Sequence, residues 1–167
     1  QTLIAKIGEN ISVRRFEVIQ GNPGEISGYS HGTRIGVLVK ILNSDTPSLG
    51  RDIAMHVAAS QPLCIDETGM PSDVLEKERN IYRAQAIDSG KSEEIVQKMV
   101  EGKVRKFLKD NTLTGQPFVK DPDTTVHHLL KAHGAVVVTA PRFEVGEGLT
   151  KRADDFVSEV MAQAQAG

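Results

Sequence analysis

The stretch EISGYSHGTRIGVLVKI, residues 25–41, decides the fold class of this chain. Residues 25–29 suit an extended strand, residues 30–33 are small or polar, and residues 35–41 are almost continuously apolar. Two such segments joined by a tight turn are typical of a β-hairpin whose second strand is buried. We therefore expect an antiparallel hairpin that belongs to a first sheet.

Helices and further strands are expected on both sides of this hairpin. Residues 1–7 have the spacing of an amphipathic helix that ends at Gly8, and residues 48–60 carry apolar side chains on one helical face. The alternation in residues 11–19 predicts a half-buried strand. Nearer the C-terminus the sequence predicts a helix at 124–133 and strands at 135–139 and 142–145.

Residues 71–110 contain two charged amphipathic segments separated by SGKS at 89–92. Apolar residues recur in each segment at three-, four- or seven-residue spacing, which predicts two helices. Because the connection is short, these helices are expected to pack antiparallel as a projecting arm. A final helix is expected at 149–165, where Phe156 belongs to an apolar stripe.

An internal echo suggests a duplication. The tetrapeptide RFEV occurs at 15–18 and again at 142–145, each time at the end of a predicted strand that follows a helix stopped by glycine. We therefore predict an α+β fold of two related subdomains with an inserted antiparallel helical hairpin, or coiled coil, and a C-terminal helix. The predicted parts are a first subdomain at 1–60, a linker at 61–70, the arm at 71–110, a second subdomain at 111–148 and a C-terminal helical module at 149–167.

Composition restricts the partners and the compartment. The net charge of −2 and an aromatic content of 4% in 167 residues do not favour direct binding to nucleic acid. No run approaches the roughly 18 apolar residues that a membrane helix requires. The single cysteine, Cys64, excludes an internal disulfide and suggests a reducing compartment, so a cytoplasmic location is expected.

No residue pattern predicts catalysis, a metal or a cofactor. The GKS at 90–92 lacks the earlier glycine of a phosphate-binding loop, because Gln85 occupies that position. His127, His128 and His133 do not have the four-residue spacing of a metal site on one helical face. We therefore expect a protein that binds another protein rather than an enzyme.

Six segments resemble bacterial elongation factor Ts, in order and across essentially the whole chain. They are IAKIGENI at 4–11, HGTRIGVLV at 31–39, DIAMHVAAS at 52–60, KMVEG at 98–102, LTGQPF at 113–118 and RFEVGEG at 142–148. The resemblance implies a core of two subdomains, a helical arm, a C-terminal helical module, and release of GDP from the GTPase elongation factor Tu. It also implies an upstream helical domain and a Thr-Asp-Phe-Val motif, both of which would precede Gln1, so the chain is expected to be a fragment that keeps the docking surface.

The resemblance and the local sequence together suggest two groups of partner contacts. Arg34, Ile35 and Gly36 follow the hairpin turn, where a glycine beside an apolar residue lets another backbone approach closely. The residues Met55, His56 and Val57 match a contact motif of the family. Alanine at 56 is expected to weaken binding without lowering the melting temperature.

Each of these candidates has an alternative interpretation. Arg34, Ile35 and Gly36 suit an ordinary turn, and His56 suits a hydrogen-bonded core histidine. Phe156, also a candidate contact, lies on a C-terminal helix that docks either on the partner or on its own core.

Two other functions stay open at this stage. The helical arm rather than the core could recruit a different protein, such as a polymerase, or a second copy of the chain. A separate N-terminal fragment is a further possible partner of the chain. The other alternative is a small metabolic enzyme, which a deep pocket lined by titrating groups would support.

Overall fold

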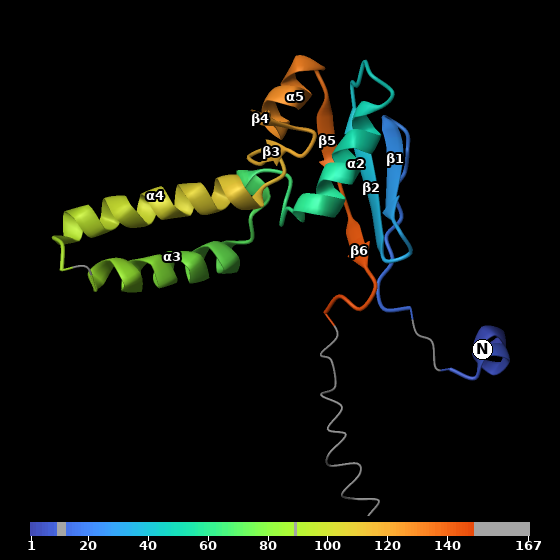
Figure 1. The fold of residues 1–167 in the computed structure, drawn as a ribbon, viewed down its shortest axis with the longest axis horizontal. Helices are drawn as coiled ribbons and strands as arrows, with labels where there is room; N and C mark the ends of the chain where they lie inside the picture. Colours follow the sequence, from blue (N-terminus) through green and yellow to red (C-terminus); the bar gives the residue numbers. More distant parts are fainter. Residues whose placement is uncertain (10–12, 89, 149–167) are drawn as a thin grey trace, which may run out of the picture.

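The computed structural model describes residues 1–9, 13–88 and 90–148. It combines α-helices with antiparallel strands, so the predicted α+β class is confirmed (Figure 1). The elements in chain order are α1 (Thr2–Ile7), β1 (Glu25–His31), β2 (Ile35–Leu42), α2 (Leu49–Ser60), a short 3-10 turn (Glu67–Gly69), α3 (Ser72–Ile87), α4 (Glu93–Asn111), β3 (Pro117–Phe118), β4 (Asp121–Thr125), α5 (Val126–Ala132), β5 (Val136–Thr139) and β6 (Arg142–Glu144).

The main sheet is organised around β2. Residues 35–41 of β2 pair antiparallel with β1, from Glu25 opposite Ile41 to His31 opposite Ile35. On the other side β5 pairs with the end of β2 and β6 pairs with its beginning. The predicted hairpin is therefore confirmed, although its turn lies at 32–34 and both strands are fully paired up to it.

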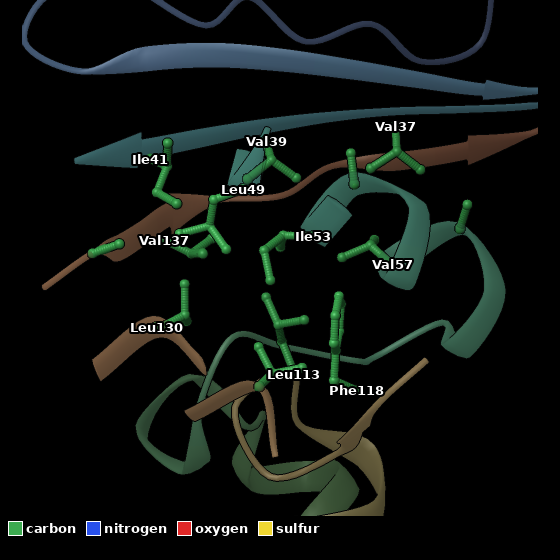
Figure 2. Packing of buried hydrophobic residues seen from close by; sticks show 14 residues of the cluster. Val37, Val39, Ile41, Leu49, Ile53, Val57, Leu113, Phe118, Leu130 and Val137 are labelled. Atoms are coloured by element: carbon green, nitrogen blue, oxygen red, sulfur yellow. The ribbon is translucent and has the colours of Figure 1, made fainter. Parts of the chain in front are cut away.

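One face of this sheet is covered by α2 and forms the main hydrophobic core (Figures 1 and 2). Strand residues alternate between the two faces of a sheet, so Val37, Val39 and Ile41 are all directed towards α2. At Gly50 the helix comes so close to β1 that an added Cβ would lie 2.9 Å from Cβ of Ser27. The core is completed by residues from the second half of the chain, which are Leu113, Phe118, Val126, Leu130, Ala135 and Val137.

The helices α3 and α4 lie side by side and extend away from the sheet (Figure 1). Their contact buries a second apolar cluster, formed by Ala86, Val96, Val100 and Val104 with Leu75, Tyr82, Met99 and Leu108 around it. In the described part of the chain, this cluster and the main core have no residue in common. The helical pair, defined here as α3 and α4, therefore packs as a separate unit.

The segments that enter and leave the helical pair run beside each other. Backbone hydrogen bonds of 2.8 to 2.9 Å join residues 63–65 to residues 111–114. The exit is tightly packed at Gly115, where an added Cβ would lie 2.6 Å from the carbonyl oxygen of Lys109. This close approach explains why the LTGQPF segment has a glycine at position 115.

Several local predictions have a definite outcome. The first helix ends as predicted at Gly8, which has a φ of 77°. The strand predicted at 11–19 is wrong for residues 13–19, because they pair with no strand of the described chain and Phe16 is 80% exposed. The short strands β3 and β4 were not predicted. The predicted C-terminal helix and Phe156 lie outside the described residues.

Candidate functional site

The three residues predicted after the hairpin turn lie at one end of β2. Arg34 is exposed, with its guanidinium 3.9 Å from the carboxylate of Glu144, and Ile35 is half-buried against the core. Within residues 1–9, 13–88 and 90–148, and apart from its two chain neighbours, no atom lies within 4 Å of a Cβ added at Gly36. All three line an open groove of about 590 Å³ beside the turn. Another molecule can therefore reach the backbone of Gly36.

The sheet face opposite α2 carries apolar side chains that are accessible to solvent. Gly36 is paired with Phe143, and Leu38 is the next residue of β2 on the same face. We call this surface the outer face, and its large apolar members are Ile26, Leu38, Val136, Val138 and Phe143, with exposed fractions of 36 to 52%. In the sequence, the near-continuous apolar runs of β2 and β5 were the feature that could have indicated this apolar outer face. An apolar surface of this kind is characteristic of protein contact.

Charged side chains border the groove beside Gly36. The guanidinium of Arg15 lies 5.1 Å from the ring centroid of Phe143 and donates a 2.7 Å hydrogen bond to Glu147. That hydrogen bond holds the pKa of Glu147 below its ordinary value. Arg142 is largely buried, donates 2.6 Å to Glu144 and also reaches the backbone carbonyl of Ala58. The end of α2 is thereby connected to β6.

The second predicted group, Met55, His56 and Val57, lies on α2. Met55 is half-buried, whereas His56 is 0% exposed and Val57 belongs to the main core. The structure thus does not place these three residues on one surface with Arg34 and Gly36. A direct contact between His56 and a partner stays an untested prediction.

Both ring nitrogens of His56 have hydrogen-bond partners. Nδ1 accepts the backbone N–H of Val119 at 3.2 Å, and Nε2 lies 3.0 Å from Oε1 of Gln116. Because Nδ1 faces a donor, the ring proton resides on Nε2, which donates to Gln116. Burial lowers the pKa of His56, although the bond to Gln116 partly opposes this effect. The ring is therefore neutral at pH 7.

The described ranges contain no group of three His, Cys, Asp or Glu side chains arranged to hold a metal ion. The thiol of Cys64 donates to the carbonyl of Asp66 at 3.1 Å, and burial raises its pKa. Among residues 1–9, 13–88 and 90–148, every helix is too short or too polar to span a lipid bilayer.

Fold and surface together place the chain among α+β proteins that expose an apolar sheet face next to a hairpin turn. A model of the family described as Elongation factor TS matches residues 1–147. The chain therefore belongs to the elongation factor TS family, and the resemblance seen in the sequence is confirmed.

Proteins named Elongation factor Ts are similar to this chain over nearly its entire length. The protein of Methylococcus capsulatus is 59% identical over 98% of this chain. Those of Thioalkalivibrio sulfidiphilus and Alkalilimnicola ehrlichii are each 54% identical over the same share. In all three cases the match covers 56% of the relative, so the chain spans little more than half of their length.

Proposed function

We propose that this chain forms part of a guanine-nucleotide exchange factor that promotes release of GDP from elongation factor Tu. Family membership carries the proposal, because the family model matches residues 1–147 and a protein named Elongation factor Ts is 59% identical over 164 residues. Such an exchange makes and breaks no covalent bond. It therefore requires a docking surface rather than a catalytic set.

The energetics of exchange follow from linkage between two ligands of one GTPase. A protein that binds the empty GTPase more tightly than the GDP-loaded form must weaken GDP binding by the same factor. Typical couplings of this kind are about 1–3 kcal/mol, equivalent to about 5–150-fold in affinity. Preference for the empty form is thus the property that defines the function.

The proposal predicts faster release of a fluorescent GDP analogue from elongation factor Tu when the chain is added. Mant-GDP fluorescence in a stopped-flow instrument measures the rate, and titration measures the affinity for empty and GDP-loaded GTPase. We expect tighter binding to the empty form by about fivefold or more. Equal affinities, both for this chain and for one extended with the upstream part of a relative, would contradict the proposal.

We propose that the docking surface consists of Arg34, Ile35 and Gly36 together with Leu38 and Phe143 on the outer face. The open space above Gly36 supports this choice, because no neighbour among the residues that the structure describes occupies it. Apolar surface around an accessible backbone is suited to close contact with another protein. The exposed guanidinium of Arg34 adds a charge at the edge, where it affects association rate and specificity.

Replacing Gly36 by valine is expected to weaken binding to elongation factor Tu at least tenfold and to leave the melting temperature unchanged or slightly higher. An added Cβ meets no atom of the described residues beyond its chain neighbours within 4 Å, and valine favours a strand. The same side chain would separate a partner backbone from β2. Calorimetric titration and thermal denaturation measure the two effects.

Gly102 in α4 provides the matched control for Gly36. It is exposed, and a Cβ there also has no atom of a described residue outside its own stretch of helix backbone within 4 Å. Gly102→Ala is expected to stabilise the helix by about 0.5–1 kcal/mol without any change in binding. Unchanged binding in Gly36→Val would exclude Gly36 from the docking surface.

We further propose the finer architecture that the sequence suggests. In it, α3 and α4 form an antiparallel hairpin inserted between subdomains at 1–60 and 111–148, with a linker at 61–70. The separate apolar cluster of the helical pair and the paired segments at its base support this division. The proposal also includes a C-terminal helix at 149–167, a contact role for Phe156 and a cytoplasmic location.

A further inference from the structure

Gln116 lies where α2, α4 and the β3–β4 segment meet. Its side chain is buried, and its amide nitrogen donates to the carbonyl oxygens of Ser60 at 3.3 Å and Asp110 at 2.8 Å. Ser60 is the last residue of α2, and Asp110 lies in the last turn of α4. Carbonyl groups in the last turn of a helix have no partner within the helix. One amide therefore caps two helices that belong to different apolar clusters.

His56 holds this amide from the opposite side. Its Nε2 donates to Oε1 of Gln116 at 3.0 Å, so the carbonyl side of the amide also has a partner. On its other side Nδ1 accepts the N–H of Val119, and the rings of His56 and Phe118 lie 6.0 Å apart. The orientation of Gln116 is thus determined by three partners. Breaking a buried bond of this kind leaves an unsatisfied group.

In the described residues, the helical pair is joined to the core mainly through the two chain segments at its base. Two chain segments cross between them and are joined by the backbone bonds of residues 63–65 and 111–114. The apolar cluster of the helical pair does not extend into the main core within the described residues. Because these two segments are adjacent, they fix where the helical pair leaves the core, but they leave it able to change direction about that point. A third, separate point of attachment is needed to hold the direction.

We propose that Gln116 is the positioning residue that sets the direction in which the helical pair leaves the core, and that His56 holds Gln116 in place. The bonds to Ser60 and Asp110 join the end of α2 directly to the end of α4. With these bonds present, the helical pair keeps one direction relative to the sheet. The inference concerns the chain alone, so it is tested independently of nucleotide exchange.

The direction of the helical pair can be measured with spin labels in the intact chain. In a Cys64→Ser background, labels at Lys91 and Lys131 report the distance between the connection of α3 to α4 and the core. Labels at Arg51 and Lys131 report a distance within the core, and all three positions are exposed. In Gln116→Leu we expect a broader 91–131 distribution with a shifted mean. The 51–131 distribution is expected to stay as in the parent protein.

Two substitutions of His56 separate its hydrogen bonds. In His56→Asn the side-chain oxygen can still accept from Val119, but the bond to Gln116 is lost, so the 91–131 distribution is expected to broaden. His56→Gln can still donate to Gln116, so it is expected to broaden the distribution less. If Gln116→Leu does not fold, the 91–131 distance distribution of His56→Asn tests the proposal in its place.

A purely structural role is distinguished by Val137→Ala. This substitution removes volume from the main core, and Val137 is not a hydrogen-bond or ring partner given for Gln116 or His56 in the described residues. This variant is expected to lose stability and to keep the parent 91–131 distribution. The proposal is overturned if folded Gln116→Leu, or His56→Asn in its place, has the parent distribution. It is also overturned if Val137→Ala broadens the distribution equally.

Discussion

Replacing Ile53 by alanine is expected to lower the free energy of unfolding by about 2–5 kcal/mol, the usual range for removing a large aliphatic side chain from a core. Ile53 is 0% exposed and lies on the side of α2 that faces the sheet. Figure 2 shows it between the strand residues and Leu113, which comes from the second half of the chain. Alanine would leave a cavity where these parts of the fold meet. Urea denaturation measures the loss.

A comparable deletion in the helical pair provides the control. Val104 is buried in the second cluster, which is separate from the main core in the described residues. Val104→Ala is expected to reduce hydrogen-exchange protection in α3 and α4 and to leave the sheet protected, because regions of a protein can open independently. Ile53→Ala is expected to reduce protection in the sheet. A loss below about 1 kcal/mol in Ile53→Ala would contradict the core described here.

His56→Ala is expected to lower the free energy of unfolding by about 2–4 kcal/mol, because it leaves the N–H of Val119 and Oε1 of Gln116 without their buried partner. This replaces the expectation from sequence that the melting temperature would stay unchanged. Any loss of binding to elongation factor Tu in this variant must therefore be corrected for the unfolded fraction. Thermal and urea denaturation at pH 7.5 give the stability.

The same histidine is expected to make stability depend on pH. Burial lowers its pKa from the ordinary value of 6.5, so the unfolded chain takes up a proton before the folded chain does. Stability is unaffected by His56 well above pH 6.5. It falls as the pH decreases below that value, by at most about 1.4 kcal/mol per pH unit, until the folded state is also protonated.

His56→Asn separates this contribution from those of other titrating groups. Asparagine does not titrate, whereas the other four histidines and the carboxylates remain in both proteins. Urea denaturation between pH 7.5 and 5.5 is expected to give a smaller loss of stability in His56→Asn than in the parent chain. Equal losses in the two proteins would show that the ring is not held in its neutral form.

Much of the secondary structure could be predicted because its causes are local. Apolar spacing predicted α2, α3 and α4, and Gly8 marked the end of α1. The hairpin at 25–41 combined strand propensity with a turn, and its pairing is continuous. Family membership was also accessible from the sequence, because six segments occur in the expected order.

Other features depend on contacts between distant parts of the chain. The alternation at 13–19 suggested a strand, but a strand requires a partner and these residues have none in the described chain. The strands β3 and β4 are too short for a periodic pattern to appear, and β4 contains the unfavourable sequence Asp-Pro-Asp. Local pattern also could not reveal how β5 and β6 share the two halves of β2.

The amino-acid sequence by itself determined the α+β class, the positions of most helices and strands, and the family, because each of these is encoded in neighbouring residues. Only the tertiary structure decided which candidates are accessible. It left Gly36 open to solvent and enclosed His56, whose partner Gln116 is 60 residues further along the chain. Burial and hydrogen bonding depend on which distant segments meet, and periodicity within one segment carries no information about that.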